Sequence, residues 1–227
     1  MEIRIEHLIE GAKVAKGLVV IIDVFRATTT AAYVMNNGAE KIIPVNSLEQ
    51  AFEMKRRNPD YILMGERNGL KVKGFDYGNS PFEIINIDFA SKTVIMTTSA
   101  GTKGIVYAKD ANEIILGSFV SANSVVNYIK DENPEIVTLV ALGEAGIEST
   151  DEDELCAKYI KNLLEGNNPD FENIKNYLKN YNSALKFFDI NKPKFPEGDF
   201  DCAMDLDRFN FILKVIEIDN YRVIVKL

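Results

Sequence analysis

The sequence predicts an α/β fold: a layered α/β/α arrangement with a mostly parallel, mixed sheet and an antiparallel C-terminal hairpin. Two observations carry this expectation. Short β-branched runs alternate along the chain with segments of helical spacing, which is typical of parallel strands joined by crossover helices. The runs are also nearly continuous in apolar residues, as in strands that are buried on both faces.

Six apolar runs are expected as strands, and the segments between them as helices. The expected strands are Leu18–Val24, Lys41–Val45, Tyr61–Met64, Lys92–Thr97, Glu113–Leu116 and Glu135–Leu142. The expected helices are Thr28–Asn36, Leu48–Arg57, Lys103–Lys109, Ala122–Lys130 and Asp151–Leu164.

The C-terminal part of the chain predicts a hairpin. The runs Phe209–Ile218 and Tyr221–Val225 have strand character, and the Asp219-Asn220 pair between them suits a two-residue turn. We expect this hairpin to form an antiparallel edge of the sheet. A polar helix is expected over Asp170–Tyr181, followed by a proline-containing loop over Asn191–Gly198.

Length and composition indicate one ordinary globular domain. The chain has 227 residues, 46% hydrophobic and 26% charged, which excludes a disordered or fibrous protein. We expect a single domain over residues 1–227, with a subdivision near 166–169 as the weaker alternative. No apolar run approaches the roughly 20 residues of a membrane helix, and the N-terminal segment lacks a signal-peptide core. A cytoplasmic location without a membrane partner is therefore expected.

The charge balance narrows the class of partner. The chain carries 26 basic and 34 acidic residues, a net charge of −8, whereas nucleic-acid-binding proteins usually present a basic face. We therefore expect no nucleic-acid partner. An acidic chain that handles a small anion must hold it with local donors or a bound cation. A homo-oligomer is compatible with the sequence.

Residue types narrow the chemistry further. His7 is the only histidine, so a Ser-His-Asp triad or a multi-histidine zinc site has almost no support; His7 is expected to be exposed or on an edge strand. The spacing of Cys202 and Arg208 matches a cysteine-dependent phosphatase loop, but Asp205 and Asp207 would repel phosphate there. Carboxylates, hydroxyls, backbone amides and a hard metal ion must therefore carry any catalysis.

Polar residues follow the first expected strand, where ligands collect in parallel sheets. Asp23 ends the run, Arg26 follows it, and Thr28 opens the next segment. A helix N-terminus with a nearby arginine suits an anion. The alternative is a capping Asp and Thr with an Arg at the surface. In the functional interpretation, replacing Arg26 harms substrate use and not folding.

A long glycine-rich stretch follows the strand at Tyr61–Met64. It contains Glu66 and Asp76, whose carboxylates suit a hard cation such as Mg²⁺. Parallel strands should bring Glu66 to the same sheet edge as Asp23. Ser80 and Glu83 read as a capping box that starts a helix, so Glu83 is not expected to bind metal.

Three more strand ends carry small or acidic residues. They are Thr97–Thr102, Gly117–Asn123 and the stretch from Gly143 to the acids at Glu152–Glu154. Turns of this composition expose backbone amides to an oxyanion. Together with Asp23 they predict one polar, anion-binding crevice.

Several of these motifs occur in the order seen in the 2-phosphosulfolactate phosphatase family, which the chain resembles. They are Val19–Thr30, Gly65–Gly69, Gly74–Pro81, Thr97–Thr102, Gly117-Ser118, and Glu152-Asp153 followed by Cys156-Ala157. The resemblance implies a magnesium-dependent hydrolase that removes phosphate from (2R)-2-phospho-3-sulfolactate, a step toward coenzyme M.

The residues and the resemblance together give a set of expected site residues. Catalysis is assigned to Asp23, Arg26, Glu66 and Asp76, and Mg²⁺ to Asp23, Glu66 and Asp76. Substrate binding is assigned to Arg26, Thr28, Arg67, Asn79, Ser99, Gly101, Thr102, Gly117 and Ser118. The nucleophile is either a metal-bound water or Asp23 itself.

Two other functions stay open. One is a phosphatase for another phosphorylated hydroxy acid, and the other is a non-catalytic protein that binds small anions. A haloacid-dehalogenase-type phosphatase is excluded, because that class needs Asp-x-Asp after its first strand. Phe25 stands at the second Asp position here.

Overall fold

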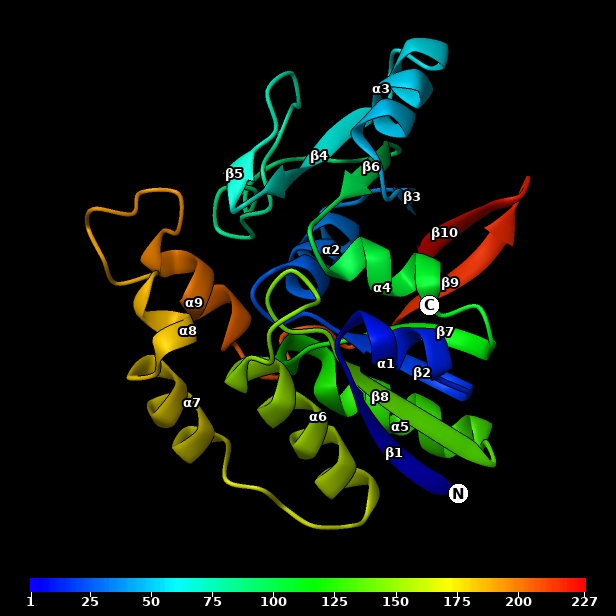
Figure 1. Cartoon of the computed structure of the whole chain (residues 1–227), viewed down its shortest axis with the longest axis vertical. Coiled ribbons are helices and arrows are strands. Elements are labelled where there is room, and N and C mark those ends of the chain that lie inside the picture. Colours follow the sequence, from blue (N-terminus) through cyan, green and yellow to red (C-terminus); the bar gives the residue numbers. More distant parts are fainter.

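A computed structural model describes residues 1–227. The strands are β1 (Glu2–His7), β2 (Gly17–Ile22), β3 (Lys41–Pro44), β4 (Ile62–Arg67), β5 (Leu70–Lys71), β6 (Thr93–Thr97), β7 (Ala111–Gly117), β8 (Ile136–Ala141), β9 (Leu213–Ile218) and β10 (Tyr221–Lys226). The helices are α1 (Leu8–Val14), α2 (Ala27–Asn36), α3 (Leu48–Arg57), α4 (Gly101–Tyr107), α5 (Ala122–Glu132), α6 (Asp151–Leu164), α7 (Phe171–Lys179), α8 (Asn182–Leu185) and α9 (Glu197–Ala203), with a 3₁₀ turn at Phe119–Ser121 (Figure 1).

The predicted α/β fold with a mostly parallel, mixed sheet is confirmed. All six expected strands and the helices between them are present, and their bounds differ by a few residues. The strands form a sheet in the order β1-β8-β2-β7-β9-β10-β3-β6-β4-β5. The sequence did not predict β1 and α1. β1 pairs only with β8 at one edge of the sheet, and its charged and apolar residues alternate, a pattern of half-buried strands that differs from the continuous apolar runs of the six expected strands.

The C-terminal hairpin is confirmed, but its expected place at the sheet edge is wrong. β9 pairs with β7 and β10 pairs with β3, both antiparallel, so the hairpin lies in the middle of the sheet. Leu213, Val223 and Ile224 are buried there. Asp219 and Asn220 both have positive φ, 50° and 65°, as a tight hairpin turn requires.

The hairpin joins two blocks of parallel strands that run in opposite directions. β1, β8, β2 and β7 form one block, and β3, β6 and β4 form the other. Six steps across the sheet separate β2 from β4. Twist of about 20–25° per step adds to roughly 120–150°, which turns the second block back toward the first. The carboxyl ends of both blocks can therefore contribute to one site.

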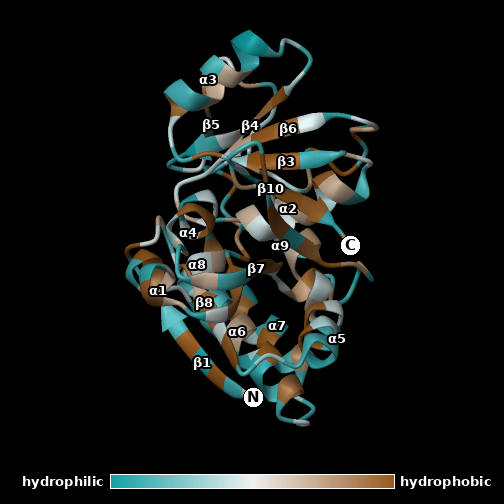
Figure 2. Cartoon of the chain, turned by 90° about the vertical axis from the view of Figure 1, so that its right-hand side faces the viewer, coloured by the Kyte–Doolittle hydropathy of each residue, from teal (hydrophilic) through white to brown (hydrophobic).

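Helices cover both faces of the sheet. Successive residues of β2 pack alternately into two large apolar clusters, so the strand is buried on both sides. α1 packs with α4 in one layer, and α5 packs with α6 in the other. In Figure 2 the strands are largely brown, whereas the outer turns of α3 and α5 are teal. No helix in the chain has the length and apolarity needed to cross a membrane.

Two smaller expectations have different outcomes. Ser80 Oγ accepts a hydrogen bond from Glu83 N–H at 3.1 Å, but the residues that follow form turns and not the expected helix. Ser80 Oγ also donates to Asp199 Oδ1 at 2.5 Å, which ties it to α9. His7 is exposed at the end of edge strand β1, as expected, and lies 2.6 Å from Glu154 Oε1.

Candidate active site

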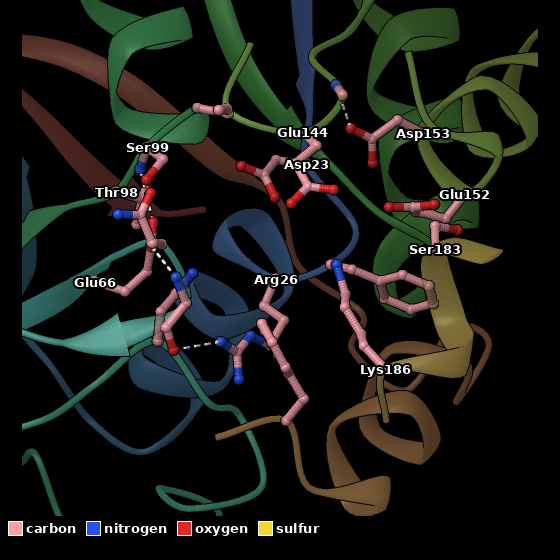
Figure 3. Close-up of a pocket in the computed structure, with 18 of the residues that line it drawn as sticks. Asp23, Arg26, Glu66, Thr98, Ser99, Glu144, Glu152, Asp153, Ser183 and Lys186 are labelled. Atoms are coloured by element: carbon pink, nitrogen blue, oxygen red, sulfur yellow. Dashed lines mark hydrogen bonds between the residues drawn. The ribbon is translucent and has the colours of Figure 1, made fainter. Parts of the chain in front are cut away.

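A polar pocket of about 630 Å³ opens where carboxyl ends from both strand blocks meet. Its walls come from the residues that follow β2, β6 and β8, from the β4–β5 turn, from the start of α6, and from the segment that contains α8 and reaches toward α9. Figure 3 shows the acidic side chains of Asp23, Glu144, Glu152 and Asp153 above Arg26 and Lys186, with Glu66 on the opposite side. The pocket therefore combines negative and positive walls.

Asp23 directly follows β2 and lies next to the N-terminus of α2. Its Oδ1 accepts the Ala27 N–H at 3.1 Å, and its own carbonyl oxygen accepts Thr28 Oγ1–H at 2.8 Å. Burial raises the pKa of Asp23 to about 6, and the nearby carboxylates of Glu66 and Glu152 add to this. Hydrogen bonds from Ala27 and Gly101 act in the opposite direction. Asp23 thus accepts the first N–H of α2, whose N-cap position is Arg26, and it also forms part of the pocket wall.

Gly101 allows the start of α4 to approach Asp23 closely. A Cβ added at Gly101 would lie 2.5 Å from Ala27 Cβ and 2.9 Å from Asp23 Oδ2. Ala27 Cβ is fixed by the backbone, and the Asp23 carboxylate is held by the Ala27 N–H, so the backbone or the carboxylate would have to move.

Replacing Gly101 with alanine should therefore lower the free energy of unfolding by about 1–3 kcal/mol, which is the usual cost of overpacking. Urea denaturation measures this loss. Gly78→Ala is the matched control, because an added Cβ there meets only ordinary van der Waals contacts, the nearest of them Lys71 Cβ at 3.6 Å. An equal loss in both variants would show that the approach to Asp23 is not the cause.

Glu66 ties two turns together at the end of the second strand block. It is buried, its Oε1 accepts Ser99 N–H at 2.7 Å, and its Oε2 accepts Gly69 N–H at 2.8 Å. Arg67 turns away from the pocket and donates to Thr97 Oγ1 at 2.9 Å. Glu66 therefore fixes the β4–β5 turn against the turn after β6.

Two acids at the start of α6 complete the negative wall. Asp153 Oδ1 and Oδ2 accept the N–H groups of Val24 and Gly143, at 2.7 Å and 2.8 Å. Burial raises the pKa of Asp153 well above its usual value, and Glu152 and Asp23 raise it further. Burial also raises the pKa of Glu152, and nearby Ser183 and Lys186 partly oppose that shift. Glu152 Oε2 is buried without a hydrogen-bond partner.

Arg26 lines the pocket, as expected, and it is also buried in an ion pair, so from the structure we expect its loss to harm folding as well as substrate use. Its side chain is 4% exposed, and Nη1 lies 2.5 Å from Oδ2 of the fully buried Asp199. Nη1 also donates to the Lys194 carbonyl at 3.2 Å. Burial raises the pKa of Asp199, and Arg26 opposes that shift. Arg26 is therefore part of a buried ion pair that links α2 to α9.

The structure brings some predicted site residues together and leaves others outside. Those that line the pocket are Asp23, Arg26, Glu66, Asn79 and Ser99. Asp76 does not: its Oδ2 accepts Leu63 N–H at 2.8 Å and lies 3.6 Å from Lys55 Nζ. Asp76 thus stabilises the glycine-rich loop against β4 and α3, and the structure does not place it with Asp23 and Glu66.

The remaining predicted residues shape the turns behind the pocket. They are Thr28, Arg67, Gly101, Thr102, Gly117 and Ser118. The Thr98 N–H donates to Thr102 Oγ1 at 2.9 Å, and the Thr102 N–H donates to Thr98 Oγ1 at 3.1 Å. A Cβ at Gly117 would lie 2.6 Å from Val20 Cγ1, so this glycine serves the contact with β2. Ser118 is buried.

Several pocket residues were absent from the expected set. Glu144, Glu152 and Asp153 were expected in the crevice because they follow the end of β8, but no catalytic, binding or metal role was assigned to them. Lys186, Lys192 and Lys194 also line the pocket. They lie in an irregular segment without strand or helix periodicity, so no pattern in the sequence marked them.

The pocket suits a hard divalent cation, although no three His, Cys, Asp or Glu side chains are arranged as a ready metal site. Mg²⁺ is commonly held by one or two carboxylates together with water and substrate phosphate. Buried Asp23 and Glu152 supply such oxygens, and Glu152 Oε2 has no other partner. The donor set therefore fits Mg²⁺, with Glu152 and not Asp76 beside Asp23.

Comparisons with known proteins point to one family. A family model described as 2-phosphosulpholactate phosphatase matches residues 3–215. Three similar proteins are each named "Probable 2-phosphosulfolactate phosphatase". The one from Caldicellulosiruptor saccharolyticus is 41% identical over 66% of this chain and 64% of its own length. Those from Bacillus subtilis and Clostridium acetobutylicum are 33% and 39% identical, over 86% and 69% of this chain and 86% and 66% of their own lengths.

Proposed function

The chain belongs to the 2-phosphosulfolactate phosphatase family, as its motifs indicated, and from this we propose that it is a phosphoric monoester hydrolase. The proposed reaction converts (2R)-2-phospho-3-sulfolactate and water to 3-sulfolactate and inorganic phosphate. The observation that carries the proposal is a single pocket lined by four buried carboxylates, by Arg26 and by a group of lysines. The carboxylates are those of Asp23, Glu66, Glu152 and Asp153.

The proposed substrate explains why both signs of charge are needed. It carries phosphate, carboxylate and sulfonate groups, which the acidic wall would repel. The acids also repel one another: burial is the main cause of the raised pKa values of Asp23 and Asp153, and neighbouring carboxylates add to both shifts. A cation at this wall removes both repulsions. We therefore propose that Asp23 and Glu152 hold Mg²⁺. When bound, Mg²⁺ draws charge from the phosphoryl oxygens.

Asp23 is the residue that we assign to the phosphoryl group. The N–H groups of Ala27 and Gly101 hold its carboxylate in one orientation at the pocket. A carboxylate fixed in this way can attack phosphorus and break its bond to the sulfolactate oxygen, after which water hydrolyses the aspartyl-phosphate to phosphate and free Asp23. Alternatively, it can orient a water that attacks phosphorus directly. Both roles require the same position, and both fail when the carboxylate is lost.

Removal of divalent cations should abolish phosphate release from phosphosulfolactate. The physical reason is the uncompensated acidic wall, which then faces a substrate with three anionic groups. The measurement is inorganic phosphate released by protein dialysed against EDTA, before and after Mg²⁺ is added. Restored turnover is the expected result, and full turnover after exhaustive chelation would contradict the magnesium assignment.

A further inference from the structure

The wall opposite the acids gathers positive charge around one aromatic ring. The Phe195 ring centroid lies 4.9 Å from Arg26 Cζ, 5.2 Å from Lys186 Nζ and 5.1 Å from Lys194 Nζ. All four residues line the pocket. Contact with a ring face offsets part of the repulsion among cations, but it does not neutralise them.

Two of these cations have no acidic partner. Arg26 is paired with Asp199, and Nζ of neighbouring Lys192 lies 3.8 Å from Asp189 Oδ2. Lys194 Nζ donates only to the carbonyl oxygen of Asn68, at 3.0 Å. Lys186 Nζ contacts the rings of Phe187 and Phe195, and its charge acts on the Glu152 carboxylate without forming an ion pair with it. The chain has a net charge of −8, yet two ammonium groups without an ion-pair partner lie at one pocket wall. This arrangement favours the binding of an anion there.

Unpartnered polar atoms in the same pocket also point to a ligand. Asn79 Oδ1 and Ser183 Oγ are buried without hydrogen-bond partners, and both residues belong to the pocket lining. Buried polar groups in folded proteins are normally satisfied. Ser183 Oγ–H, beside Glu152, can donate to an anion in the pocket, whereas Asn79 Oδ1 is an acceptor and needs a donor such as water.

We propose that Lys186 and Lys194, placed on Phe195, bind the non-reacting anionic groups of the substrate, its sulfonate and carboxylate. The proposal rests on the proposed function, because it takes phosphosulfolactate as the substrate. The phosphate then lies toward Asp23, and the rest of the molecule extends toward the segment between α8 and α9, seen in orange in Figure 1. A lysine ammonium is a compact point charge on a flexible stem, which suits a rounded sulfonate.

A graded series of phosphate monoesters tests this assignment. Phosphosulfolactate has two non-reacting anionic groups, 2-phospholactate has one, and isopropyl phosphate has none. In the wild-type protein kcat/KM should fall along this series. In the double variant Lys186→Ala/Lys194→Ala, kcat/KM for phosphosulfolactate should drop by about 10- to 100-fold, while isopropyl phosphate is little affected. If the difference in kcat/KM between phosphosulfolactate and 2-phospholactate shrinks in the double variant, the lysines bind the sulfonate. If the difference between 2-phospholactate and isopropyl phosphate shrinks, they bind the carboxylate.

Lys179→Ala is the matched control. Lys179 also lies over an aromatic ring, 5.5 Å from the centroid of Phe188, but it is outside the pocket lining. Its replacement should leave all three substrates unchanged. An equal loss for every substrate in the double variant, or no loss for any, would overturn the assignment of the two lysines.

A binding measurement separates this inference from the proposed function. Calorimetric titration with 3-sulfolactate needs no turnover, so it judges the lysines even if the protein releases no phosphate. Wild-type protein should bind 3-sulfolactate, and the double variant should bind it at least about 10-fold more weakly. Absent binding, or equal binding by both proteins, would refute the lysine site, whereas binding without phosphate release would refute only the phosphatase.

Discussion

Replacing Asp23 with asparagine is expected to lower kcat/KM for phosphosulfolactate by about 10³-fold or more, equivalent to ~4 kcal/mol of transition-state stabilisation. Asparagine has nearly the same size and keeps one oxygen for the Ala27 or Gly101 N–H. It loses the charge that would hold a cation and act on the phosphoryl group. Steady-state phosphate release measures the effect, and thermal unfolding shows whether the variant is folded.

Asp76→Asn is the matched control for Asp23→Asn, because the sequence alone gave both aspartates the same role. The structure gives Asp76 bonds to Leu63 and Lys55 outside the pocket. An asparagine there can still accept the Leu63 N–H, so activity close to wild type is expected. Loss of activity in Asp76→Asn but not in Asp23→Asn would reverse the assignment made from the structure.

Replacing Arg26 with alanine is expected to destabilise the fold by about 3–5 kcal/mol, because it leaves the Asp199 carboxylate buried without its counter-ion. Both side chains are almost fully enclosed, at 4% and 0% exposure. Urea denaturation at neutral pH measures the loss. The exposed pair of Arg57 and Glu53 provides the comparison, since Arg57→Ala should cost no more than about 0.5 kcal/mol.

A double-mutant cycle identifies the source of the Arg26 effect. In Arg26→Ala/Asp199→Ala, the second substitution removes the charge that the first leaves unpaired, so the two losses should not add. The coupling should exceed the ~0.5 kcal/mol seen between independent sites. Losses that add within that margin would mean that Arg26 stabilises the protein through its other contacts, such as the ring of Phe195.

The carboxyl ends of the strands carry most of what the sequence could predict about the site. The buried run of β2 fixes where the strand stops, so Asp23 must emerge at the sheet edge. The same reasoning located Glu66 and Ser99. Asp23 and Glu66 do line one pocket, as expected, but parallel pairing of their strands does not explain it. β2 and β4 belong to opposed blocks, and sheet twist brings their ends to one pocket.

The positions of loop side chains and of the C-terminal segment could not be predicted from the strand ends. Asp76 lies in a glycine-rich stretch, where the sequence does not fix the direction of a side chain, and the Leu63 amide and Lys55 bind it outside the pocket. The buried partner of Arg26 comes from α9, far away in the sequence. Lys186 and Lys194 reach the pocket through tertiary packing on Phe195, which no local pattern encodes.

The most direct test of the central claim is phosphate release by the wild-type protein, with Mg²⁺, from a panel of phosphorylated hydroxy acids that includes phosphosulfolactate. The account predicts turnover with the highest kcat/KM for phosphosulfolactate, because this pocket offers cations to a substrate with three anionic groups. A higher kcat/KM for another member would keep the phosphatase and replace its substrate. No phosphate release from any member, with 3-sulfolactate still raising the melting temperature, would contradict the account and leave an anion-binding protein.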